Sequence, residues 1–93
     1  MFLKAPDCLY NLNKMLNLEI MPLTDTQNCV VAYTLRIKYD DDFFPVPIYT
    51  AKTQQEARAI LQVIAWEITR NTKVIDLSFI VNELKKQGKL SCE

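Results

Sequence analysis

The 93-residue sequence contains no histidine and only one glycine, and both absences restrict what the chain can do. Histidine is the commonest acid or base near neutral pH and the commonest metal ligand, so its absence excludes histidine-dependent triads and most catalytic zinc sites. One glycine excludes the glycine-rich phosphate-binding loops, which need several glycines at fixed spacing. We expect a non-enzymatic protein without a cofactor or a metal site. An enzymatic alternative would need a cysteine nucleophile activated by Lys, Asp or Glu.

The cysteines are odd in number and far apart, at Cys8, Cys29 and Cys92, and none forms a C-x-x-C pair. Small domains of oxidising compartments usually contain an even number. No signal peptide is visible, and the apolar runs are too short to span a membrane. These features predict a cytoplasmic protein that does not bind membranes, with Cys8 and Cys29 as small side chains of the core.

The charges balance, with 11 basic and 11 acidic residues, so no basic excess favours nucleic acid or anionic lipid as the main partner. Apolar residues make up 49% of the chain and charged residues 24%, which is typical of a soluble globular protein. The length suits a single domain over residues 1–93 with one modest core.

Alternation of apolar and polar residues predicts strands at residues 15–23 and 30–39. A shorter strand is expected at residues 1–5, residues 9–12 suit a strand or a turn equally well, and a polar turn is expected at residues 24–28. In the strand at 30–39 one face should point to the core and the other to solvent. The core set is Val31, Tyr33, Leu35, Ile37 and Tyr39, and the solvent set is Val30, Ala32, Thr34, Arg36 and Lys38.

A further strand is expected at Phe43–Thr50, after a turn at Asp40–Asp42. Pro45 and Pro47 lie two residues apart, so their missing N–H groups fall on the same edge of this strand. The opposite edge, through Phe44, Val46 and Ile48, should pair with residues 30–39. We therefore expect an edge strand that prolines protect against further pairing.

The segment Thr53-Gln54-Gln55-Glu56 matches a capping box, which predicts a helix that continues to about Thr69. Its apolar stripe consists of Ala57, Ile60, Leu61, Ile64, Ala65 and Ile68. After an extended segment at residues 73–75, Asp76 or Ser78 should cap a second helix. This helix carries Leu77, Ile80, Val81 and Leu84 on one side, and Gly88 suits its left-handed end.

Strands followed by helices predict an α+β fold. We expect a small antiparallel β-sheet of three to five strands in a meander at residues 1–50. Residues 51–93 should add an amphipathic helix packed on one face of the sheet and a shorter C-terminal helix. This order resembles the architecture of many small phage, plasmid and host proteins, including anti-CRISPR-type inhibitors. The resemblance implies a binding role, and one alternative is a phage or mobile-element inhibitor of a host defence complex.

Two surfaces are candidates for contact with another protein. Ala59, Val63 and Trp66 lie about half a turn from the main stripe, so they form a second apolar surface on the long helix. Either the C-terminal helix covers this surface, or Trp66 anchors a partner or a second copy. The acidic turn Asp40, Asp41 and Asp42 with Phe43 is the other candidate. We expect a protein-binding module that acts as a homodimer, adaptor or inhibitor.

Nucleic-acid binding is the alternative. Arg36 and Lys38 should point outward from the strand at 30–39, and only Phe43 or Tyr49 could supply an exposed ring for stacking on bases. The remaining candidate contacts are the C-terminal lysines Lys85, Lys86 and Lys89.

Overall fold

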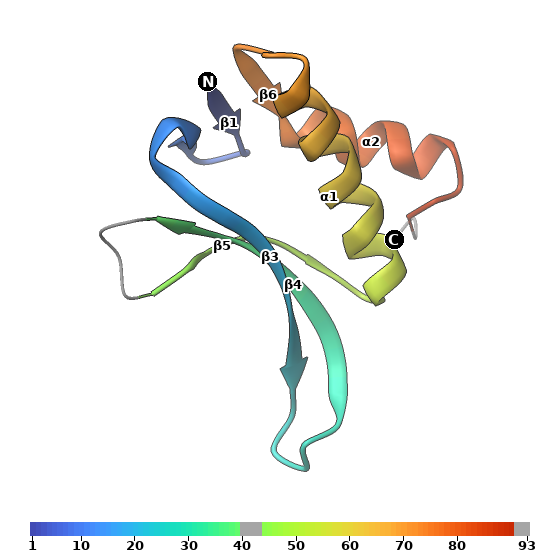
Figure 1. The fold of residues 1–93 in the computed structure, drawn as a ribbon. Coiled ribbons are helices and arrows are strands. Elements are labelled where there is room, and N and C mark those ends of the chain that lie inside the picture. The colour runs from blue at the N-terminus through green and yellow to red at the C-terminus, as the bar shows by residue number, and fades with distance from the viewer. Residues whose placement is uncertain (40–43, 91–93) are drawn as a thin grey trace. The chain divides into compact units, whose positions relative to one another are not determined.

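A computed structural model describes residues 1–39 and 44–90 of the chain, apart from the side chain of Leu16. The elements follow one another in the order shown in Figure 1. They are β1 (Phe2–Lys4), β2 (Leu9–Asn11), the short 3-10 helix η1 (Leu12–Lys14), β3 (Met15–Thr24), β4 (Val30–Tyr39), β5 (Val46–Ala51), α1 (Gln54–Thr69), β6 (Val74–Asp76) and α2 (Leu77–Lys86). The predicted α+β class is confirmed, with mainly antiparallel strands that precede a long helix and a shorter C-terminal helix. The predicted turn at Asp40–Asp42 and the residue Phe43 lie outside the described residues.

The strands form two three-stranded sheets, in the orders β2-β1-β6 and β3-β4-β5. The chain is organised as two compact units. The first unit contains residues 1–13 and 59–93, and the second contains residues 14–58. The boundary between them falls within α1. The first two strands therefore belong to the same unit as the C-terminal helix, not to the meander that was expected over residues 1–50.

The first unit is built around β1, which pairs antiparallel with β2 and parallel with β6. Leu3 of β1 lies opposite Ile75 of β6, and these side chains are 0% and 1% exposed. α2 contacts β1. The other buried apolar residues of this unit include Leu12, Ile60, Ile64, Leu77, Ile80, Leu84 and Leu90. The extended segment predicted at residues 73–75 is thus confirmed as part of β6, whereas its parallel partner β1 was not predicted.

The second unit is an antiparallel meander in which β4 lies between β3 and β5. The predicted strands at residues 15–23 and 30–39 are confirmed, and so is the edge position of β5. At the predicted turn, the Oδ1 atom of Asp25 accepts hydrogen bonds from the backbone N–H groups of Gln27 (2.8 Å) and Cys29 (3.0 Å). Asn28 adopts a left-handed conformation with φ 62°, which asparagine tolerates better than most residues.

The predicted faces of β4 need two corrections. Leu35 and Ile37 are fully buried as expected, but Val31 is 58% exposed and Thr34 only 6% exposed. Val31 lies beyond the end of β5, which stops at Ala51 opposite Tyr33, and it is skipped in the pairing with β3 between Ala32 and Val30. Thr34 sits in the middle of the sheet, with Met21 opposite it on β3 and Thr50 on β5. Its neighbours on both sides shield this short side chain from water.

A β-bulge in β5 changes the position of Tyr49, which was expected to offer an exposed ring. Pro47 lies opposite Arg36, and Tyr49 lies opposite the next residue, Leu35, so Ile48 is an extra residue between them. One extra residue reverses the alternation of faces in a strand. Tyr49 therefore falls on the face that carries Leu35 and is half-buried, and Ile48 is not part of the pairing that was predicted for it.

Helix α1 starts where the capping box predicts, because the backbone N–H of Glu56 donates to the Thr53 hydroxyl oxygen at 3.2 Å. Its buried stripe is narrower than expected. Ala57, Ile60 and Ile64 are at most 1% exposed, whereas Ala65 is exposed. At about 100° per residue, Ala65 is displaced by roughly 80° from Ala57, away from the centre of the stripe.

The prediction that Cys8 and Cys29 fill the core is wrong, since both thiols are free and exposed. Each lies at the end of a tight turn. The Cys8 carbonyl accepts a bond from the Ala5 N–H (2.9 Å), and the Cys29 carbonyl accepts one from the Asp25 N–H (3.0 Å). Turn residues lie at the surface, where their backbone groups can reach water. Cys92 lies outside the described residues.

Candidate functional site

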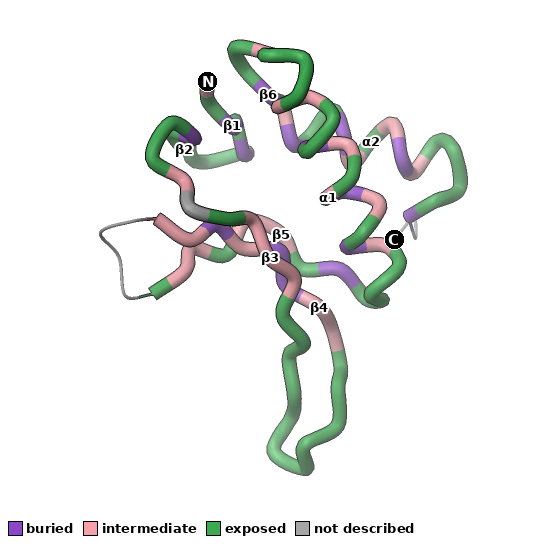
Figure 2. Tube along the Cα trace, viewed as in Figure 1, coloured by how far each residue is buried: buried purple, intermediate pink, exposed green. Residues whose placement is uncertain are grey.

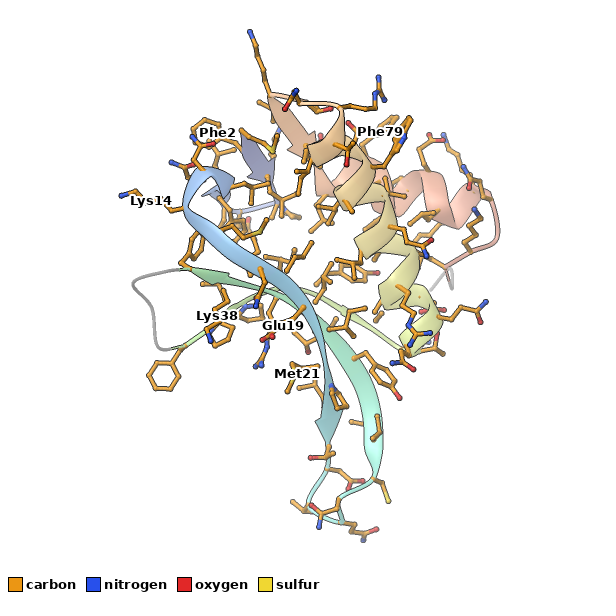
Figure 3. All side chains as sticks on the ribbon, viewed as in Figure 1. Phe2, Lys14, Glu19, Met21, Lys38 and Phe79 are labelled. Carbon is orange, nitrogen blue, oxygen red and sulfur yellow. The ribbon has the colours of Figure 1, made fainter. Side chains whose placement is uncertain are left out.

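A cavity of about 400 Å³ lies in the first unit, where α1, β6 and α2 meet. Its apolar floor is formed by the half-buried Val63 and the buried Ile75, Ile80 and Leu84. Large apolar side chains stand at its rim and remain open to solvent: Trp66 is 58% exposed, Val74 51% and Phe79 63%. Phe79 is labelled in Figure 3, close to the end of α1. We call these three side chains and the cavity the Trp66 surface.

The position of Trp66 depends on how α1 ends. Asn71 has φ 58°, a left-handed value that stops the helix. The N–H of Thr72 then donates to the carbonyl of Glu67 at 3.1 Å, and the N–H of Arg70 donates to the carbonyl of Trp66 at the same distance. Trp66 therefore lies in the last turn of a capped helix, which fixes the position of its backbone. A fixed backbone leaves less chain freedom to be lost when a partner contacts the indole.

Polar side chains hold the end of α1 at the same rim. The guanidinium of Arg70 lies 4.4 Å from the centre of the Trp66 ring. Arg70 Nη1 also approaches Glu67 Oε1 at 3.4 Å, and the hydroxyl of Thr72 donates to Glu67 Oε2 at 2.6 Å. Both oxygens of the Glu67 carboxylate thus have partners in the chain, which keeps this acidic group at the rim without an unpaired buried charge.

Asp76 places Phe79 at the cavity. It is the N-cap of α2, with φ −94° and ψ 106°, and its Oδ1 accepts from the Phe79 N–H at 3.3 Å. This is one of the two caps that the sequence predicts. Phe79 falls in the first turn and outside the apolar stripe of α2, of which Leu77, Ile80 and Leu84 are buried. Gly88 follows the helix with φ 73°, as its sequence position indicates.

The charged residues that line the cavity are mainly acidic: Glu67, Asp76 and Glu83 against Lys89. Glu83 Oε1 lies 3.6 Å from the ammonium of Lys86, an exposed pair that contributes little to stability. Because Arg70 and Lys86 lie beside Glu67 and Glu83, the apolar floor and not the charge of the rim defines the ligand, which should carry a large apolar group.

Only some of the residues that the sequence predicts for a partner interface line the cavity. Val63 and Trp66 both line the cavity, whereas Ala59 is half-buried on α1 and does not. Ile80 and Leu84 of α2 reach the floor beside Val63, yet more than half of Trp66 stays open. The C-terminal helix therefore approaches this surface without covering the indole. Asp40, Asp41, Asp42 and Phe43 lie outside the described residues.

Sequence reasoning missed Val74 and Phe79 as parts of this surface. The sequence could have indicated Phe79, because it lies outside the apolar stripe of its helix and a side chain at such a position does not face the core. Val74 gives no such signal on its own. It lies on the face of β6 opposite the buried Ile75, because successive residues of a strand point to opposite faces.

The residues proposed for nucleic-acid contact are divided between the two units, and Arg36 and Lys86 lie beside carboxylates. Arg36 Nη2 lies 2.7 Å from Glu19 Oε1, and Arg36 Nε donates to the same oxygen at 2.8 Å, so its charge is already matched (Figure 3 labels Glu19). Lys38 is half-buried on β4. Lys85 and Lys86 end α2 in the other unit, where Lys86 faces Glu83, and Lys89 lines the cavity.

No known protein-family model, curated protein or solved structure matches this chain. Over residues 1–39 and 44–90, no helix is both long and apolar enough to cross a membrane. Within the same residues, no three Cys, Asp or Glu side chains are grouped so that they could hold a metal ion.

Proposed function

We propose that the protein is a small, non-enzymatic module of the cytoplasm that binds another protein through the Trp66 surface. One observation carries this proposal: Trp66, Val74 and Phe79, each more than half exposed, surround a single cavity. Scattered exposed apolar residues are normal on proteins, but a cluster around a concave apolar floor is typical of a binding site. Tryptophan is also enriched among the residues that dominate the energy of protein interfaces.

The lining of the cavity defines the partner more closely. Its floor is apolar, and the carboxylates of Glu67 and Glu83 at the rim already lie beside Arg70 and Lys86. A partner segment that inserts an aromatic or large aliphatic side chain would fill the apolar floor. Such a contact suits an adaptor or an inhibitor, because both act by occupying a partner and need no catalytic group.

A displayed library of random peptides, selected on the immobilised full-length protein, tests this proposal. We expect the selected peptides to share a large apolar residue. Trp66→Ser and Phe79→Ser should each weaken their binding by at least about tenfold, the effect of losing an interface anchor. The matched control is Leu9→Ser. Leu9 is also a large apolar residue of this unit, is 61% exposed on β2 and does not line the cavity.

Binding can be measured by fluorescence of Trp66, which is the only tryptophan of the chain, and by calorimetry for the Trp66 variant. Circular dichroism of each variant checks that it is folded. Peptides that bind the Ser variants as tightly as the wild type, or that lose affinity equally with Leu9→Ser, would contradict the proposal. A selection that yields no specific peptide would also contradict it.

A further inference from the structure

The hairpin formed by β3 and β4 extends beyond the third strand of its sheet. Pairing between β4 and β5 ends at Tyr33 and Ala51, whereas β3 and β4 stay paired as far as Thr24 and Val30. Every residue from Met21 to Val31 is exposed, as Figure 2 shows for the free end of this hairpin. We call Met21–Val31 the β-arm. Four of its large apolar side chains are open to solvent: Met21, Leu23, Val30 and Val31. An isolated two-stranded ribbon is only marginally stable in water, so further contact would stabilise it.

The edges of this sheet are not equally protected. The outer strand β3 contains Pro22, and the outer strand β5 contains Pro47. Proline lacks the N–H donor that a neighbouring strand would need, so both outer edges are blunted. At Val30–Ala32, β4 has no described strand on the side opposite β3, because its pairing with β5 begins at Tyr33. This segment has no proline and no charge, and its β-branched middle residue, Val31, is the extra residue that the pairing with β3 skips.

The charge of the β-arm indicates what can pair with this open edge. From Met21 to Leu35 the only charged residue is Asp25. Its carboxylate already accepts two backbone hydrogen bonds within the turn. A site for a foreign segment usually selects its partner by charge or by side-chain pockets. A neutral, apolar strand edge without such features is complementary to itself, because two copies meet without like charges in contact.

We propose that the Val30–Ala32 edge of β4 pairs antiparallel with the same edge of a second copy of this chain. A two-fold axis beside Val31 would place Val30 of one copy opposite Ala32 of the other. Exposed apolar side chains of the two β-arms would add to the contact. Because the edge is three residues long, we expect the contact to be smaller than the roughly 800 Å² per partner of a standard stable interface, and the dimer to form only at high concentration.

Sedimentation and light scattering of the full chain, up to about 1 mM, test this proposal. The mass should rise from one chain towards two as the concentration increases. Val31→Lys brings two like charges together at the axis and should weaken dimerisation at least about tenfold. Thr26→Lys is the matched control, since it adds the same charge at the exposed turn and should leave the dimer intact.

Disulfide cross-linking gives a second measurement that does not depend on mass. In a background with Cys8, Cys29 and Cys92 changed to Ser, Val31→Cys should form a covalent dimer on mild oxidation. Opposite residues of an antiparallel pair have Cα atoms about 4.5–5.5 Å apart, which a disulfide can span. Thr26→Cys in the same background should cross-link much more slowly.

Specific results would overturn this inference. They are a wild-type chain that stays monomeric at every concentration, a Val31→Lys variant that dimerises like the wild type, or equal cross-linking rates for the two cysteine variants. The inference is independent of the proposed partner site, because Trp66→Ser should leave dimerisation unchanged. Loss of the dimer in Trp66→Ser would assign self-association to the Trp66 surface instead.

Discussion

The guanidinium of Arg70 lies over the ring of Trp66, with its central carbon 4.4 Å from the ring centre. A cation–π contact at an exposed position contributes about 0.5–1 kcal/mol. We expect Arg70→Ala to lower the free energy of unfolding by about this amount and to move Trp66 emission to longer wavelength. Denaturant unfolding measures the first effect. Arg58→Ala, which removes an exposed arginine from the same helix, is the control, and an equal loss in both variants would contradict the assignment.

The N-cap of α2 gives a second prediction. Asp76→Ala removes the acceptor for the Phe79 N–H and should lower the free energy of unfolding by about 0.5–2 kcal/mol. Asp76→Ser retains a capping oxygen and should recover most of that loss. Because Phe79 sits in the first turn, Asp76→Ala should also weaken any ligand of the Trp66 surface more than Asp76→Ser does. If the two variants unfold at the same denaturant concentration, the cap contributes nothing measurable.

The pair of Glu19 and Arg36 is partly exposed, with side-chain exposures of 30% and 28%. We expect a coupling free energy of about 0.2–1 kcal/mol in a double-mutant cycle with Glu19→Gln and Arg36→Gln. The coupling free energy should be smaller in 1 M salt, where the Debye screening length is only about 3 Å. Glu19→Gln also frees the arginine, so any affinity for oligonucleotides at low salt should increase in this variant. Stronger oligonucleotide binding by the wild type than by Glu19→Gln would contradict the view that Glu19 neutralises Arg36.

Burial, and after it the nearby carboxylate of Glu56, raises the pKa of Tyr49 above its ordinary value of 10.0. The folded state therefore favours the protonated phenol. The stabilisation that the protonated phenol of Tyr49 gives the folded state is fully present below pH 10.0. It is lost as the pH rises through the higher pKa of the folded state. The Tyr49→Phe variant has no phenol to ionise at this position. Its free energy of unfolding should therefore fall less than that of the wild type above pH 10.0. Denaturant unfolding on both sides of this pH checks the prediction, and parallel losses in the two proteins would refute it.

Much of the fold could be predicted from local patterns. Alternation located β3 and β4, and the capping box located the start of α1. These signals involve residues close in sequence, where geometry follows directly from periodicity. The bulge at Ile48 has no such signature, and it moved Tyr49 to the opposite face. The parallel pairing of β1 with β6 depends on packing between distant segments, which the sequence pattern does not encode.

The candidate site was predicted in part, for the same reason. Trp66 and Val63 stood out because they lie off the main stripe of a helix whose limits were known. Val74 belongs to a strand of three residues, too short for a periodic pattern. That its side chain lines the cavity with Trp66 and Phe79 follows from tertiary structure alone.

The middle position of β1 in its sheet has a consequence for how the protein is made. Leu3 meets Ile75, a residue 72 positions later in the chain. At about 5–20 residues per second, a ribosome needs roughly 4–14 s to travel between them. During this interval β1 can pair with β2 but not with its parallel neighbour, so Leu3 stays incompletely covered. β1 therefore reaches its native surroundings only after β6 has been synthesised.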